Sequence, residues 1–113
     1  MRVILKVQEI KNPVVSFCVP VYNNAEAALR IVKGILVSDD TRFEVIACDD
    51  ASKDNAQELL SQIQDSRFRY IRNDKNLGAH RNWLKSLELG RGEWLYFVIG
   101  RDRINGEHIT RLI

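Results

Sequence analysis

The 113-residue chain has the length of one domain, and 45% of its residues are apolar, which is enough to fill a single buried core. Its 17 basic and 15 acidic residues are interspersed and give a formal charge of only +2, so bulk nucleic-acid binding is not favoured. No apolar run approaches the roughly 18 residues that span a bilayer, and charge interrupts the first residues too early for a signal segment. Composition therefore predicts a cytoplasmic protein without nucleic-acid partners.

Four apolar runs predict the strands of a sheet, and these are 14–20, 43–48, 68–71 and 94–99. The first is nearly continuous, as expected for a parallel strand that is covered on both faces. Between the runs, apolar residues recur at helical spacing and predict three helices. Their apolar positions are Ala28, Ile31, Val32, Ile35 and Leu36, then Ala56, Leu59, Leu60 and Ile63, then Trp83, Leu84 and Leu87. This alternation predicts an α/β fold with a mostly parallel sheet and helices on both faces.

The two ends of the chain are less regular. Residues 1–12 are ambiguous, because Val3, Leu5 and Val7 alternate like an edge strand but the segment could equally be an extension or a pairing arm. Residues 106–113 are typical of the opening of a helix.

Cys18 and Cys48 both fall within predicted central strands. No Cys-x-x-Cys motif or histidine pair accompanies them, so neither a disulfide framework nor a cysteine metal site is favoured. We expect two reduced, buried thiols.

Polar residues follow the predicted strands where each one ends. Tyr22 and Asn23 come after the first strand, Asp49 and Asp50 after the second, and the loop 76–78 after the third. Ligands of open α/β sheets bind at this edge, where Tyr22 offers a ring for base stacking. Adjacent Asp49 and Asp50 point to opposite faces, so one can accept a hydrogen bond from a base or ribose while the other braces a loop. An alternative interpretation explains the same residues: the acids are solvated at the start of a helix, and the other residues form ordinary turns.

Other nucleotide-binding and catalytic patterns are missing from the sequence. There is no Gly-x-Gly-x-x-Gly after the first strand and no Gly-Lys-Ser/Thr, which argues against a dehydrogenase or a P-loop enzyme. His80 has no serine or cysteine at a spacing that would identify a nucleophile.

In order along the chain, the segments resemble the N-terminal half of a family 2 glycosyltransferase, which has the Rossmann-like GT-A fold. Residues 15–24 are similar to the family's Val-Ser-Ile-Ile-Ile-Pro-x-Tyr-Asn, and residues 43–52 to its Phe-Glu-Ile-Ile-Val-Val-Asp-Asp-Gly-Ser. Residues 72–83 resemble the family's Asn-x-Gly loop, and Gly92-Glu93-Trp94 its Gly-Glu-Tyr. The resemblance covers about residues 13–105.

The resemblance implies a nucleotide site. In it Asp50, or alternatively Asp49, hydrogen-bonds the base, and Arg81 contacts the diphosphate through charge-assisted hydrogen bonds. The implied nucleotide-binding residues are Pro20, Tyr22, Asn23, Asp49, Asp50, Asn76, Gly78, Arg81 and Asn82.

The resemblance also implies a divalent cation, Mn²⁺ or Mg²⁺, held after the fourth strand by an acidic cluster. Here only Asp102 represents that cluster, and Arg101 and Arg103 flank it. Two cationic side chains disfavour a dication by like-charge repulsion but can themselves stabilise a diphosphate.

The implied function is transfer of a sugar from a nucleotide-diphosphate sugar, a UDP-sugar by expectation, to a glycan, polysaccharide or lipid-linked acceptor with inversion. The family's acceptor site and catalytic base lie in a C-terminal half, so we expect a single, truncated domain over residues 1–113 that binds nucleotide without transferring sugar. No catalytic residue is assigned. Peripheral membrane association of the full enzyme and homodimerisation through an exposed sheet edge are further expectations. The alternative is a degenerate, non-catalytic interaction module.

Overall fold

The computed structural model describes residues 4–6, 13–99 and 104–113. Strands and helices alternate along these residues as the hydrophobic pattern predicts. The strands are β1 (Ile4–Lys6), β2 (Val15–Val21), β3 (Phe43–Asp49), β4 (Phe68–Arg72) and β5 (Trp94–Phe97). The helices are α1 (Ala25–Leu36), α2 (Ala56–Leu60), α3 (Ala79–Leu89), the short 3-10 helix η1 (Gly106–His108) and α4 (Ile109–Leu112). Among the described residues no helix is both long and apolar enough to cross a bilayer.

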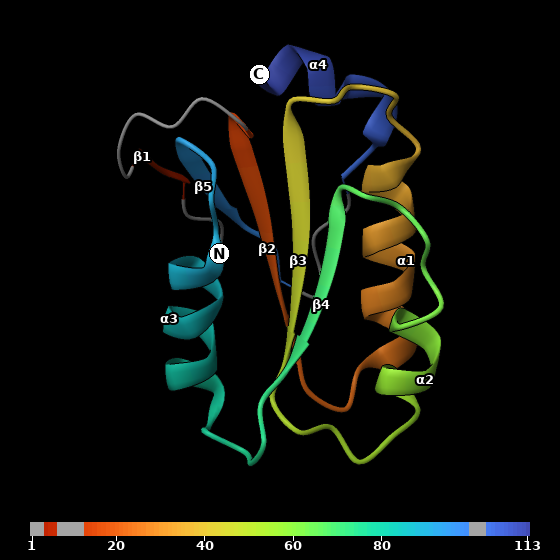
Figure 1. Ribbon diagram of the computed structural model, residues 1–113, viewed down its shortest axis with the longest axis vertical. Helices are drawn as coiled ribbons and strands as arrows, with labels where there is room; N and C mark the ends of the chain where they lie inside the picture. The colour runs from red at the N-terminus through yellow and green to blue at the C-terminus, as the bar shows by residue number, and fades with distance from the viewer. Residues whose placement is uncertain (1–3, 7–12, 100–103) are drawn as a thin grey trace.

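The five strands form one sheet in the order β1-β5-β2-β3-β4. β5, β2, β3 and β4 run parallel, and β1 pairs antiparallel with β5 at the sheet edge. The predicted mostly parallel α/β fold is confirmed, and residues 4–6 take the edge-strand alternative. Val3 and Val7 lie outside the described residues. Helices cover both faces, with α1 and α2 on one side and α3 on the other (Figure 1).

The central strands bury both of their faces. Along β2, Phe17 and Val19 pack into the core beneath α1 and α2, whereas Cys18 packs with Leu95 and Phe97 on the face of α3. Every residue of β3 is buried, which explains the apolar run from Val45 to Cys48. Cys18 and Cys48 are free and buried, as predicted.

The predicted apolar face of α3 is wrong. Asn82 and Ser86 form the buried face of this helix, while Leu84 is 50% exposed and Trp83 37% exposed. Polar residues occupy the buried face because Asn82 Nδ2 donates to the Cys48 carbonyl and Ser86 Oγ to the Trp83 carbonyl, so hydrophobic spacing alone misplaced the face. Of the predicted set, Leu87 packs against the core.

A polar network joins the strands at the amino edge of the sheet. The Glu44 carboxylate accepts hydrogen bonds from Ser16 Oγ at 2.6 Å, from Arg69 Nε at 3.1 Å and from the Arg91 amide at 2.7 Å. Ser16 Oγ also accepts the Gly92 amide at 2.7 Å, and a Cβ at Gly92 would lie 2.7 Å from the Ser16 nitrogen. The glycine of the Gly-Glu-Trp segment therefore allows a close backbone approach that holds β5 beside β2.

Candidate functional site

A cavity of about 500 Å³ opens at the carboxyl edge of the sheet, between the loops that follow β2, β3 and β4 and the first turn of α3. Pro20, Tyr22, Asp50, Asn76, Gly78 and Asn82, all predicted from the sequence, line it. Its other lining residues are Val21, Asn24, Ala79, Trp83 and Ile99. Asn23, Asp49 and Arg81 of the predicted set do not line the cavity. The topology thus brings three separate loops to one place, as expected for parallel strands.

Asp50 is the buried acid of the cavity, with 1% of its surface exposed. Its Oδ1 accepts hydrogen bonds from the Leu77 amide at 2.7 Å and Asn73 Nδ2 at 2.9 Å, and its Oδ2 accepts the Gly78 amide at 3.0 Å. Gly78 adopts φ of 92°, a conformation that favours glycine. An ionised carboxylate has about four acceptor positions, so Asp50 retains one on Oδ2 for a ligand donor.

Asp49 points to the opposite face and braces the loops. Its Oδ1 accepts the Ser52 amide at 2.9 Å, while its Oδ2 accepts hydrogen bonds from the Tyr70 hydroxyl and from Arg72 Nη1, the latter at 3.1 Å. Burial raises the pKa of Tyr70 to about 12, and the hydrogen bond to Asp49 adds to this effect. Asp49 therefore acts as an internal acceptor, whereas Asp50 faces the cavity.

The loop after β2 is tied to the loop after β3. The Asn23 amide donates to Ser52 Oγ at 2.9 Å, and Asn23 Oδ1 accepts the Lys53 amide at 2.8 Å. Asn24 stands at the N-cap position of α1, but its Oδ1 accepts the Tyr22 amide rather than a helix amide. Asn23 thus helps to shape the rim of the cavity through these two hydrogen bonds.

Ala51, beside Asp50, has φ of 59°, which lies in the left-handed region that residues other than glycine avoid. Ala51→Gly is expected to raise the free energy of unfolding by roughly 1 kcal/mol, because glycine takes this conformation without steric cost. Urea unfolding followed by circular dichroism measures the change. Ala27→Gly, inside α1, is the control and is expected to lower stability by a similar amount. Equal destabilisation by both substitutions would contradict the prediction.

Two aromatic rings line the cavity. Tyr22 is 46% exposed and was predicted from the sequence. Trp83 was missed, because its helical spacing assigned it to a packed apolar face. Its indole lies 5.3 Å from the Phe97 ring in an edge-to-face arrangement. The Asn-Trp pair that opens α3 was the available signal, because Asn82 and Trp83 both line the cavity.

Beneath the cavity, buried polar side chains hold α3 to the sheet. Asn82 Nδ2 donates to the Cys48 carbonyl at 3.0 Å, and the Cys48 thiol donates to Asn82 Oδ1 at 3.2 Å. Burial raises the pKa of Cys48 to about 11. Cys48 is consequently a neutral structural donor rather than a nucleophile.

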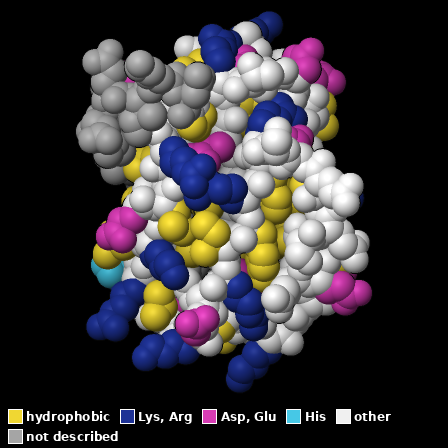
Figure 2. Space-filling model, viewed as in Figure 1, with side chains coloured by type: hydrophobic (Ala, Val, Ile, Leu, Met, Phe, Trp, Pro, Cys, Tyr) yellow, Lys and Arg dark blue, Asp and Glu magenta, His cyan; other side chains and the backbone are white. Residues whose placement is uncertain are grey.

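Exposed cations surround the carboxyl edge. Lys53, Lys75 and Arg81 are exposed on or beside its loops, and Figure 2 shows Lys and Arg side chains gathered with a few acids at this end of the molecule. Such charges attract anions such as a diphosphate. Arg81 contributes to this surface rather than to the lining of the cavity.

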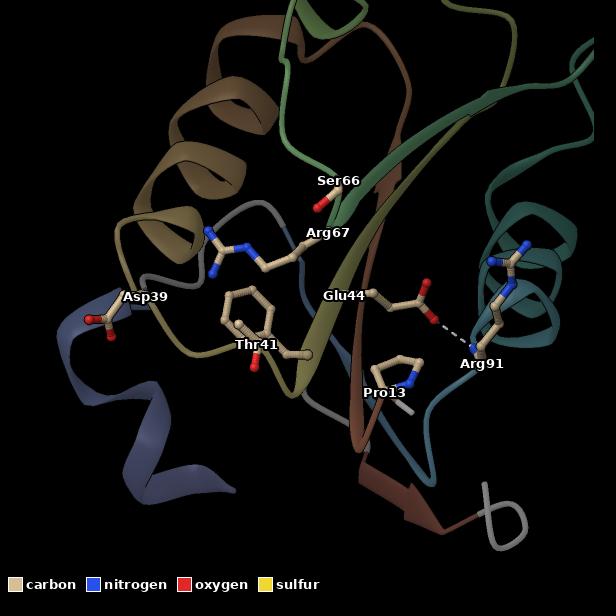
Figure 3. A pocket seen from close by; sticks show the side chains of 8 residues that line it. Pro13, Asp39, Thr41, Glu44, Ser66, Arg67 and Arg91 are labelled. Carbon is tan, nitrogen blue, oxygen red and sulfur yellow. Dashed lines mark hydrogen bonds between the residues drawn. The ribbon is translucent and has the colours of Figure 1, made fainter. Parts of the chain in front are cut away.

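A second cavity, of about 530 Å³, lies at the amino edge of the sheet (Figure 3). Two of its charged side chains, Arg67 and Glu44, are engaged within the protein. Arg67 donates to the Leu36, Ser38 and Asp40 carbonyls and to Asp65, which ties the C-terminal end of α1 to the start of β4. Glu44 is committed to the network described above. This cavity is therefore a structural junction.

The described residues contain no group of three or more His, Cys, Asp or Glu side chains arranged to hold a metal ion. Asp102, the predicted metal ligand, and its neighbours Arg101 and Arg103 lie outside the described residues. Asp50 lines the cavity as a single carboxylate that already accepts three hydrogen bonds. We accordingly assign no cation geometry to the described part of the chain.

A parallel sheet with a polar cavity at its carboxyl edge defines a Rossmann-like α/β domain. The model of the family described as Glycosyl transferase family 2 matches residues 16–112. The chain belongs to this family, as its motifs predicted.

The succinoglycan biosynthesis protein ExoO of Rhizobium meliloti is 30% identical over 103 residues, which are 91% of this chain and 30% of that protein. The chain thus spans less than a third of the length of this relative.

Among solved structures, S. aureus TarS 1-349 in complex with UDP matches with a TM-score of 0.77 at 24% identity, over 88% of this chain and 30% of that chain. The mannosyltransferase PcManGT from Pyrobaculum calidifontis in complex with GDP-Man and Mn²⁺ matches with a TM-score of 0.72 at 19% identity, over 88% of this chain and 31% of that chain. These likenesses show the GT-A fold.

Proposed function

We propose that this chain is the nucleotide-sugar-binding part of an inverting glycosyltransferase that uses a UDP-sugar. The observation that carries the proposal is the cavity at the carboxyl edge, where a buried carboxylate, two aromatic rings and loop residues meet within the stretch that matches the family. Asp50 accepts a hydrogen bond from the base and Tyr22 stacks on it. The exposed cations at this edge attract the diphosphate.

The name of ExoO places that relative in succinoglycan biosynthesis, which supports a role in polysaccharide, glycan or lipid-linked sugar assembly. We propose a cytoplasmic location for this activity. Peripheral membrane association and homodimerisation stay predictions.

In the proposed reaction a carboxylate deprotonates the acceptor hydroxyl, whose oxygen bonds to the anomeric carbon as the nucleoside diphosphate leaves. The resemblance implies that this carboxylate belongs to the family's C-terminal half, so we name no catalytic residue. The purified 113-residue chain is expected to bind donor and give no detectable transfer of sugar. Detectable transfer from UDP-glucose to a lipid-linked or glycan acceptor would contradict this restriction to donor binding.

The proposed function is tested by calorimetric titration of the chain with UDP and UDP-glucose. Tyr22→Ala is expected to weaken UDP binding about tenfold, because stacking of a base on an aromatic ring contributes about 1–3 kcal/mol. Tyr22→Phe is the matched control, since it keeps the ring, and should bind like the unaltered chain. Absence of binding to UDP, UDP-glucose and GDP-mannose would reject the proposed function.

The degenerate, non-catalytic module is the second candidate, and the arginines at 101 and 103 beside Asp102 favour it. Absence of nucleotide binding supports this module, and repeating the UDP titration with and without Mn²⁺ tests whether a cation takes part in any binding. Tighter binding with Mn²⁺ supports a donor site of the enzymatic kind. Binding that is indifferent to Mn²⁺ supports a domain in which arginines take over the role of the cation.

A further inference from the structure

A chain of hydrogen bonds connects α3 to the acid of the cavity. Lys85 Nζ donates to Asn73 Oδ1 at 2.5 Å, and Asn73 Nδ2 donates to Asp50 Oδ1 at 2.9 Å. Asn73 Nδ2 also donates to Asn82 Oδ1 at 2.9 Å. Asn73, Asn82 and Asp50 are all buried, with 3% or less of their surfaces exposed. The side-chain amide of Asn73 therefore bridges Lys85 and the Asp50 carboxylate, which lines the cavity.

The lysine sets the donor-to-acceptor direction of these hydrogen bonds. An ammonium group has three donors and no acceptor, so Asn73 must present its oxygen to Lys85. Both hydrogens of its Nδ2 are then directed to Asp50 and Asn82. Asn82 in turn receives the Asn73 amide on its oxygen and donates its own amide to the Cys48 carbonyl. The orientation of each side chain follows from the charge of Lys85.

Asp50 also differs from the other buried acids in how its charge is balanced. Asp49 lies 3.1 Å from Arg72, and Glu44 lies 3.1 Å from Arg69. Among the described residues, no Lys or Arg side chain forms an ion pair with Asp50. Its charge is offset by two backbone amides and, through Asn73, by Lys85. A buried carboxylate is costly without such partners.

We propose that Lys85 is a positioning residue that, through Asn73, holds Asp50 as an acceptor facing the nucleotide cavity. The inference rests on the proposed function, since it concerns how that site recognises its base. An acceptor at this point selects a base edge that carries an N–H donor, as the uracil imide does. Cytosine presents a lone pair at the same ring nitrogen, so Asp50 repels it. Lys85 thereby contributes to selection of UDP over CDP.

The test compares UDP and CDP affinities of the 113-residue chain and its variants by calorimetry. Lys85→Met keeps side-chain length and removes the donors, and it is expected to weaken UDP binding about tenfold with little change for CDP. Lys85→Arg keeps a donor-only cation and should retain most of the discrimination. Lys33→Met, on the exposed surface of α1, is the matched control and should leave both affinities unchanged. A purely structural role would weaken both nucleotides equally.

The unaltered chain provides a second measurement that does not depend on a variant that folds. Saturation with UDP, but not with an equal concentration of CDP, is expected to shift the side-chain amide resonance of Asn73 in nitrogen-edited NMR spectra. Unchanged discrimination in Lys85→Met, or an Asn73 resonance indifferent to bound UDP, would overturn the positioning role while the proposed function stands. Failure of the unaltered chain to bind any nucleotide would overturn both.

Discussion

Asp50→Asn should weaken UDP binding about 100-fold, or ~2.7 kcal/mol, the largest loss expected from any single change in the cavity. The carboxylate accepts the Leu77 and Gly78 amides and Asn73 Nδ2, and all of these are donors. A carboxamide has one oxygen, so its amino group must face at least one of these donors. The loop loses a hydrogen bond, and the acceptor offered to the base is weakened or replaced by a donor.

Asp74→Asn is the matched control, because Asp74 is exposed on the same loop and its side chain does not line the cavity. It removes one negative charge at a similar place in the sequence and should change UDP affinity less than twofold. Calorimetry of both variants, with circular dichroism to confirm folding, measures the difference. If the two variants bind UDP equally well, Asp50 does not recognise the nucleotide.

Glu44→Gln should lower the free energy of unfolding by about 3 kcal/mol, a large share of the 5–15 kcal/mol typical of a domain. Glu44 accepts hydrogen bonds from Ser16, Arg69 and the Arg91 amide, and the last is drawn in Figure 3. A glutamine amino group turned toward any of these donors leaves both buried and unsatisfied, and Arg69 loses its anionic partner. Thermal unfolding followed by circular dichroism should show a midpoint lower by roughly 10 °C.

Glu88→Gln, on the exposed surface of α3, serves as the control and is expected to shift the midpoint by no more than about 2 °C. Because Glu44 lies at the amino edge, its replacement should leave UDP affinity unchanged under conditions where the variant is folded. A midpoint shift as small as that of the control would mean that the network contributes little to stability.

The architecture could be predicted because its signals are local in sequence. β2 and β3 are mostly apolar since these strands are covered on both faces, and the spacing from Ala28 to Ile35 places one stripe of α1 on the sheet. The face of α3 could not be predicted in this way. Asn82 is buried there because the Cys48 carbonyl of β3 accepts its amide, and Ser86 because the Trp83 carbonyl accepts its hydroxyl, and such partners are not visible in a hydrophobic pattern.

The candidate site, too, could be predicted only in part from the sequence. Strand alternation said only that one of Asp49 and Asp50 would face the ligand, and the resemblance named Asp50 ahead of Asp49. The structure assigns Asp49 to Tyr70 and Arg72 and leaves Asp50 in the cavity. Arg81 was named for its charge and lies on the surface around the cavity, whereas Trp83 lines it.

By itself, the sequence determined the fold class, the family and the strand ends at which a ligand site would form, because periodicity and turn residues are properties of neighbouring positions. Tertiary structure alone decided how each acid is held and which side chains orient the acid that faces the cavity. Lys85, Asn73 and Asp50 lie on or beside three different elements, and hydrogen bonds between them exist only after the sheet and α3 have packed together.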